Sequence, residues 1–175
     1  MARKEALKDL QIRLAERLKQ ARSEGISAAW LAVQVGSGNY LFPLAQAGEI
    51  FPLAPMSWVP YVRPWFMGVV NLRGGLFGVV DLAGFMARTE SVIRTEPGAH
   101  ARLVTFNADL EVNSALLVDA LIGLRRNDAF VRSVPAHEGA PNYFGQQLVD
   151  AEGVSWQEIN MQSLAKDPEF LTIGT

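Results

Sequence analysis

Residues 68–82, GVVNLRGGLFGVVDL, decide the fold of this 175-residue chain. They contain two short apolar runs with the β-branched composition of strands, separated by the polar sequence NLRGG at residues 71–75. Two glycines in that segment supply the backbone freedom that a tight hairpin needs, so the stretch predicts a strand, a turn and a second strand. Arg73 is the single cation between two segments that want to be buried. Its stem can pack on apolar neighbours while its guanidinium pairs with a carboxylate.

Short strands recur on both sides of this hairpin. They come at intervals of about 8–12 residues with turn residues between them, a pattern typical of an all-β barrel or sandwich. The segments 84–99 and 132–142 are predicted as loops. The proline-rich segment 52–64 is also predicted as a loop, because proline cannot donate to a central ladder, and its aromatic residues suit a lid or a binding lip. The two strands of the hairpin are predicted at residues 66–72 and 76–82. The other predicted strands cover residues 30–35, 40–44, 47–51, 102–107, 112–118, 121–125, 144–150 and 154–160.

Both ends of the chain are predicted to be helical. Residues 3–22 have an apolar stripe at helical spacing, with seven Lys and Arg against three Asp and Glu in residues 1–22. A basic amphipathic helix can lie on a membrane or on an acidic partner, but this stripe is narrow and lacks aromatic anchors, so we favour docking on the protein's own domain. Residues 161–170 predict a short helix that is interrupted at Pro168. The N-terminal stripe consists of Leu7, Leu10, Leu14, Leu18 and Ala21.

Composition excludes several classes of function. The chain has no cysteine, which excludes disulfides and thiolate metal sites and fits a reducing cytoplasm. A formal net charge of −2 and a pI of about 5.7 argue against a nucleic-acid binder. No apolar stretch approaches the roughly 18 uncharged residues of a membrane span, so we expect no membrane insertion.

The inventory of reactive side chains predicts that the protein is not an enzyme. Only two histidines are present, both in predicted loops, and they lack further ligands at the spacing of a zinc site, so we expect no metal and no cofactor. There is no Gly-x-Ser-x-Gly nucleophile elbow. Asp109 with Glu111, and Asp150 with Glu152, form two acidic pairs, but both lie beside turns, where such side chains are usually solvated.

The hairpin stretch resembles the signature of the CheW-like coupling proteins of bacterial chemosensory arrays, a G-V-x-N-L-R-G segment followed by an apolar strand that ends in Asp-Leu. Residues 118–123, VDALIG, are similar to the family's V-D-x-V-x-G stretch. The resemblance implies a mainly β fold: two small five-stranded SH3-like β-barrels packed on each other over a shared hydrophobic core. It makes residues 27–175 the CheW-like domain, with subdomains at about 38–100 and 101–155 and terminal segments that cross over, and residues 1–26 an N-terminal helical extension.

The ending of the chain, LAKDPEFL at residues 164–171, resembles the members of this family that serve type IV pili and twitching motility. The resemblance implies a non-enzymatic cytoplasmic adaptor at membrane-associated receptor arrays. Its partners would be the cytoplasmic tip of a methyl-accepting chemoreceptor and the CheW-like regulatory domain of a CheA-type histidine kinase. Two alternatives stay open: an adaptor of a flagellar or other chemosensory array, and a small-molecule-binding β-barrel, which would need a polar pocket.

The resemblance also implies a coupling site around the hairpin. The family arginine matches Arg73, and a family glutamate in a strand before the proline-rich loop matches Glu49. We expect these two side chains to form an ion pair at the edge of the first barrel. Such a pair can contact the receptor, or it can merely fix the wall of a groove. The full set of candidate site residues is Glu49, Gly68, Asn71, Leu72, Arg73 and Gly74.

Overall fold

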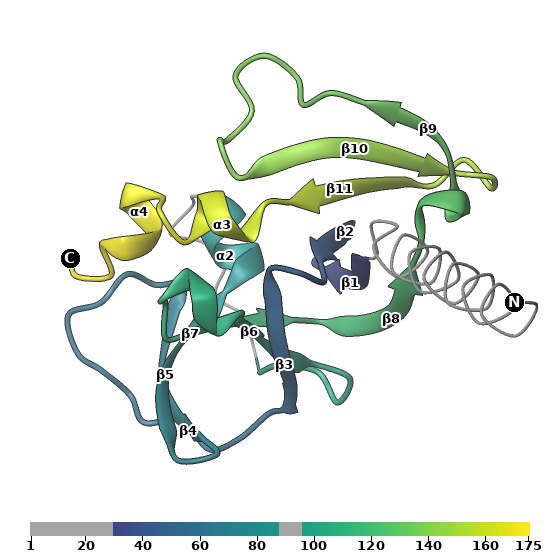
Figure 1. Ribbon diagram of the computed structural model, residues 1–175. Helices are drawn as coiled ribbons and strands as arrows, with labels where there is room; N and C mark the ends of the chain where they lie inside the picture. Colours follow the sequence, from purple (N-terminus) through teal and green to yellow (C-terminus); the bar gives the residue numbers. More distant parts are fainter. Residues whose placement is uncertain (1–29, 88–95) are drawn as a thin grey trace, which may run out of the picture.

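The computed structural model describes residues 30–87 and 96–175 (Figure 1). The helix predicted for residues 3–22 lies outside this part of the chain. Among the described residues, no helix is long and apolar enough to cross a membrane. The strands are β1 (Trp30–Val35), β2 (Gly38–Pro43), β3 (Ala47–Pro52), β4 (Phe66–Leu72), β5 (Gly75–Asp81), β6 (Arg102–Phe106), β7 (Ser114–Val118), β8 (Ala120–Arg125), β9 (Phe130–Val134), β10 (Phe144–Asp150) and β11 (Ser155–Ile159). The helices are α2 (Leu82–Ala87), α3 (Met161–Leu164) and α4 (Pro168–Leu171), and η1 (Ala108–Leu110) and η2 (Asn127–Ala129) are 3₁₀ turns.

The strands form two sheets. One has six strands in the order β8-β1-β2-β11-β10-β9, and the other has five in the order β3-β6-β7-β5-β4. Neighbouring strands are antiparallel except at β2–β11 and β5–β7, which are parallel. The first two strands of the described chain therefore join the last four, while β6 and β7 join β3, β4 and β5. Sheet membership thus divides the chain differently from the expected subdomain boundaries near residue 100, which stay a prediction.

The main hydrophobic core lies between the two sheets, as the resemblance implies. Alternate residues of β1, such as Leu31 and Val33, meet alternate residues of β6 and β7, such as Val104 and Leu116. The opposite faces of the same strands are buried in two smaller clusters, one in each sheet. Burial on both faces explains why residues 103–106 of β6 and 115–118 of β7 are all buried and, except Thr105, all apolar, instead of alternating between apolar and polar. The prediction of a mainly β fold of two packed halves is confirmed.

Two local predictions are wrong. The segment expected to be a loop from residue 84 begins inside α2, an apolar helix that packs so closely that a side chain at Gly84 would press on Trp65. The segment expected to be a loop from residue 132 begins inside β9, an edge strand of the six-stranded sheet. Both elements are too short to show a clear period in the sequence, since α2 has six residues and β9 has five.

The C-terminal segment closes the main core. Pro168 does not merely interrupt a helix; it starts α4, and the Asp167 carboxylate caps that helix by accepting the Glu169 and Phe170 N–H groups. Phe170 is buried against Phe85, with ring centroids 5.5 Å apart, and stacks on Trp65. The three helices gather between the two sheets near the C-terminus (Figure 1). The tail that resembles the pilus branch is thus a core element.

The proline-rich segment between β3 and β4 is tied down at two points. Ser57 exchanges two backbone hydrogen bonds with Val69 on the outer edge of β4. Val62 bridges to Gly174 near the C-terminus. Trp58 and Tyr61 are 78% and 86% exposed, among the most exposed aromatic side chains of the described residues. The segment therefore covers one sheet edge while it leaves two aromatic rings in solvent.

Candidate functional site

The hairpin between β4 and β5 turns in two residues, Arg73 and Gly74. Their φ angles are 50° and 83°, so both adopt left-handed conformations, as the type I′ turn of a tight hairpin requires. The Asn71 side-chain oxygen accepts the Gly74 N–H at 2.9 Å and fixes the turn. Glycine takes a positive φ freely, whereas arginine does so at a cost. The turn therefore holds Arg73 at the hairpin tip in a conformation that its side chain does not favour.

The ion pair predicted between Arg73 and Glu49 is present. Arg73 Nη1 lies 2.6 Å from Glu49 Oε2, and the two side chains are 75% and 57% exposed. The guanidinium also lies over the Phe51 ring, 5.6 Å from its centroid. Because Glu49 and Phe51 belong to β3, and Arg73 follows β4, these contacts connect the two edge strands of the five-stranded sheet. The pair is accessible to a partner.

The other predicted site residues have structural positions that the sequence leaves open. Leu72 is buried in the smaller apolar cluster of the five-stranded sheet, on the face opposite the main core. Gly68 lies at an irregularity in the β4–β5 ladder with φ 133°, and a side chain there would collide with the Ser57 carbonyl. Asn71 and Gly74 are exposed and shape the turn. A role of these four residues in partner binding stays a prediction.

Apolar side chains accompany the charged pair on the surface. Ile50 directly follows Glu49 and is 43% exposed, and Leu76 pairs with Asn71 across the hairpin and is 63% exposed. An ion pair beside exposed aliphatic side chains suits an amphipathic helix, which offers both apolar and polar contacts. Sequence reasoning missed two residues that support the pair, Phe51 under the guanidinium and the buried Thr105 beside Glu49. Phe51 lies two residues after Glu49, a spacing that places two side chains on the same face of a strand, but nothing in the sequence indicates what Thr105 contacts.

The acidic pair Asp150 and Glu152 lies at the turn between β10 and β11. Asp150 orders the β10–β11 turn: its carboxylate accepts the Glu152 and Val154 N–H groups and the Trp156 indole N–H. The indole hydrogen bond is the largest cause that lowers the pKa of Asp150 below its ordinary value of 3.8. Within residues 30–87 and 96–175, no three His, Asp or Glu side chains gather closely enough to hold a metal ion.

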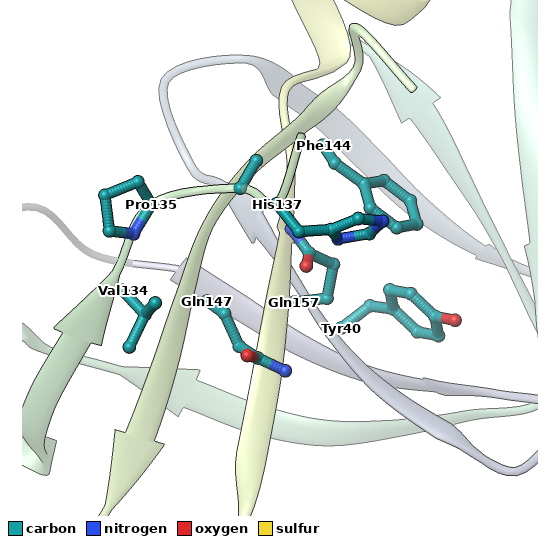
Figure 2. Close-up of a pocket in the computed structure, with 8 residues that line it drawn as sticks. Tyr40, Val134, Pro135, His137, Phe144, Gln147 and Gln157 are labelled. Atoms are coloured by element: carbon teal, nitrogen blue, oxygen red, sulfur yellow. The ribbon is translucent and has the colours of Figure 1, made fainter. Parts of the chain in front are cut away.

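A pocket opens on the six-stranded sheet, away from the hairpin. Figure 2 shows the rings of Tyr40, His137 and Phe144 on one side of it and Pro135 on the other. Burial raises the pKa of the Tyr40 phenol. The amide of Gln157 already donates to the carbonyls of Gly145 and Glu158, so it serves the fold. The complete lining is Tyr40, Val134, Pro135, Ala136, His137, Phe144, Gln147 and Gln157.

Comparisons with known proteins agree with this architecture. Residues 29–169 match the family described as CheW-like domain. The chain is 27% identical over 164 residues to Protein PilI from Pseudomonas aeruginosa, an alignment that covers 93% of this chain and 89% of PilI. In fold, it is similar to the crystal structure of the scaffolding protein TtCheW from Thermoanaerobacter tengcongensis. The TM-score is 0.59 at 13% identity, over 77% of this chain and 89% of that one.

The family match covers most of the chain, including both sheets and the helices α2 and α3. It also includes the hairpin that carries Arg73 and the strand that carries Glu49. The likeness to TtCheW supports the arrangement of the two sheets, and the likeness to PilI extends along nearly the whole sequence. The chain therefore belongs to the CheW-like domain family of coupling adaptors.

Proposed function

We propose that this chain is a non-enzymatic adaptor that couples a methyl-accepting chemoreceptor to a CheA-type histidine kinase in a two-component system controlling type IV pili. The adaptor lies in the cytoplasm and is recruited to membrane-associated receptor arrays. The single observation that carries the pilus assignment is the likeness to PilI along 93% of the chain. Membership of a family of scaffold proteins supports the adaptor role.

The surface around the hairpin tip supports a contact with a receptor helix. It combines the accessible Arg73–Glu49 pair with the exposed side chains of Ile50 and Leu76. An exposed pair adds only about 0–1 kcal/mol to folding stability. The interaction energy of the pair can rise when a bound partner excludes water from it, because charges interact more strongly where the effective dielectric constant is low.

The alternative adaptor role, in a flagellar or other array, involves the same chemistry and differs only in its partners. The small-molecule alternative has its best location at the pocket beside Tyr40 and His137. Nothing in that lining favours a particular ligand over solvent. We therefore retain the pilus adaptor as the proposed function.

Reconstitution tests the adaptor role. Autophosphorylation of a CheA-type kinase from the same organism is measured with a receptor-tip fragment, with and without this chain. We expect stimulation only when all three proteins are present. Equal stimulation without the chain would refute the proposal. Deleting the gene separates the two arrays, because the pilus assignment requires lost twitching with normal swimming.

A double-mutant cycle tests the site. Arg73→Ala and Glu49→Ala are each expected to lower receptor-dependent kinase stimulation while the protein stays folded. Because both substitutions break the same pair, the double variant should lose less than the two single losses combined. Leu76→Ala, on the neighbouring strand, shows how much a purely apolar contact contributes. Strictly additive losses, or full stimulation by Arg73→Ala, would place the coupling surface elsewhere.

A further inference from the structure

The strand that carries Glu49 contains a β-bulge. Ala47 pairs with Phe106 and Ile50 pairs with Val104, so β3 has one more residue than β6 between these two pairs. The bulge interrupts the regular exchange of backbone hydrogen bonds at Glu49. Something other than the ladder must therefore hold the Glu49 backbone in place.

Thr105 supplies the missing contacts. Its Oγ1 accepts the Glu49 N–H at 2.8 Å and donates to the Glu49 carbonyl at 3.2 Å. One hydroxyl can do both because it has one donor and two acceptor lone pairs. Thr105 is 5% exposed and lies between Val104 and Phe106, which are buried and apolar. Its burial is therefore explained by the two hydrogen bonds to Glu49.

Gly48 makes room for this arrangement. A Cβ at residue 48 would collide with both Thr105 Oγ1 and the Phe106 carbonyl. Its φ is not positive, so glycine is needed here for close approach and not for turn geometry. The bulge, the glycine and the hydroxyl together fix where the Glu49 carboxylate leaves β3.

We propose that Thr105 is a positioning residue for the Arg73–Glu49 pair. This pair connects the two edge strands of the five-stranded sheet through side chains, where no backbone ladder joins them. The ladder runs from β3 to β4 with three strands between them, and Glu49 meets the hairpin tip that follows β4. Thr105 holds the β3 end of this connection. The inference rests on the proposed function in one respect only, namely that this connection between the edge strands serves receptor coupling.

Amide hydrogen exchange in the isolated full chain tests the positioning. Thr105→Val keeps the side-chain shape but loses both hydrogen bonds, so exchange of the Glu49 N–H should rise about fivefold. The side-chain protons of Arg73 should also lose the ring-current shift caused by the Phe51 ring. Thr105→Ser keeps the hydroxyl and should preserve both signals. Thr172→Val is the matched control, because it removes a hydroxyl that donates to Pro168 in α4.

Unchanged Glu49 exchange and an unchanged Arg73 shift in Thr105→Val would overturn the proposal. If Thr105→Val does not unfold cooperatively, Gly48→Ala replaces it, because a Cβ there must push Glu49 and Thr105 apart while the hydroxyl is kept. The same two signals should then change in Gly48→Ala, and their persistence would equally overturn the proposal.

Binding of a receptor-tip fragment adds the functional arm. Thr105→Val should weaken affinity by about the same factor as Glu49→Gln, and combining the two should add little. Thr105→Ser should restore wild-type affinity. If Thr105→Val disrupts the pair but tip affinity stays at the wild-type level, the positioning inference is supported and the coupling role of the pair is refuted.

Discussion

Replacing Arg73 by asparagine separates stability from coupling. Arg73 has a φ of 50° at the first position of a type I′ turn, where asparagine is preferred. Arg73→Asn therefore improves the turn and removes the ion pair and the contact with the Phe51 ring at the same time. Gly74, which is already suited to the second position, is left unchanged.

The opposing contributions are similar in size. The left-handed conformation costs a residue with a long side chain about 1–2 kcal/mol, and most of this cost is recovered in asparagine. The lost pair is worth about 0–1 kcal/mol, because both side chains are more than half exposed. The exposed cation–π contact is worth about 0.5–1 kcal/mol. We expect the free energy of unfolding to change by less than about 1 kcal/mol, whereas breaking a buried pair would cost roughly 3–5 kcal/mol.

Urea denaturation measures the stability term, and receptor-dependent kinase stimulation measures coupling. The expected result is an unchanged m value with a small shift in midpoint, while stimulation falls to the level of Arg73→Ala. Glu111→Asn is the matched control, since Glu111 is exposed, has a φ of 55° at the end of η1 and takes no part in the Arg73–Glu49 pair. It gains from the turn conformation without losing the Arg73 pair. A loss above about 3 kcal/mol, or full coupling in Arg73→Asn, would refute the reasoning.

Three further predictions concern other parts of the molecule. Phe170→Ala should lower the free energy of unfolding by about 3–5 kcal/mol, because a buried ring that contacts three aromatic neighbours is lost; calorimetry showing less than about 1 kcal/mol would contradict this. Removing residues 1–22 should leave cooperative thermal unfolding, because the predicted strands start after them; a non-cooperative melt of the shortened protein would rule this out. Asp150 has a lowered pKa, so its contribution to stability is complete above pH 3.8 and is lost as the pH falls through the folded-state value. Stability measured from pH 7 to pH 2 should therefore show the difference between wild type and Asp150→Asn shrinking below about pH 4, and a constant difference would exclude this role.

Much of the fold follows from local pattern. The hairpin at residues 68–82 combines β-branched runs with a glycine turn, and both features are local, so its strands are predicted to within one residue at each end. The sequence predicts a break at Pro168, and the break is present, but Pro168 also begins α4. Proline is favourable in the first turn of a helix, although it is harmful inside one. The sheet orders are not local, and they depend on which of many apolar strands pair.

The candidate site shows the same limit. Arg73 and Glu49 could be paired from their resemblance to a known pattern, but their exposure depends on the three-dimensional arrangement of two sheet edges. In the sequence, Thr105 is a polar residue between the apolar residues Val104 and Phe106. Nothing there distinguishes it from a polar residue that is merely tolerated in a strand. Its contact with Glu49 exists only because a bulge interrupts the β3–β6 ladder, and a bulge leaves no clear signal in a single sequence.

The first two described strands belong to the same sheet as the last four, and this arrangement determines when each sheet can be completed during synthesis on the ribosome. The five-stranded sheet uses β3 to β7, so all its strands have been translated once Val118 is added. The β1–β2 hairpin precedes all of them but waits for β8 on one side and β11 on the other. A nascent chain must therefore carry this apolar hairpin without its final neighbours until residue 159 has left the exit tunnel. Premature termination before β11 would leave β2 with an uncovered edge, a surface that chaperones and proteases recognise.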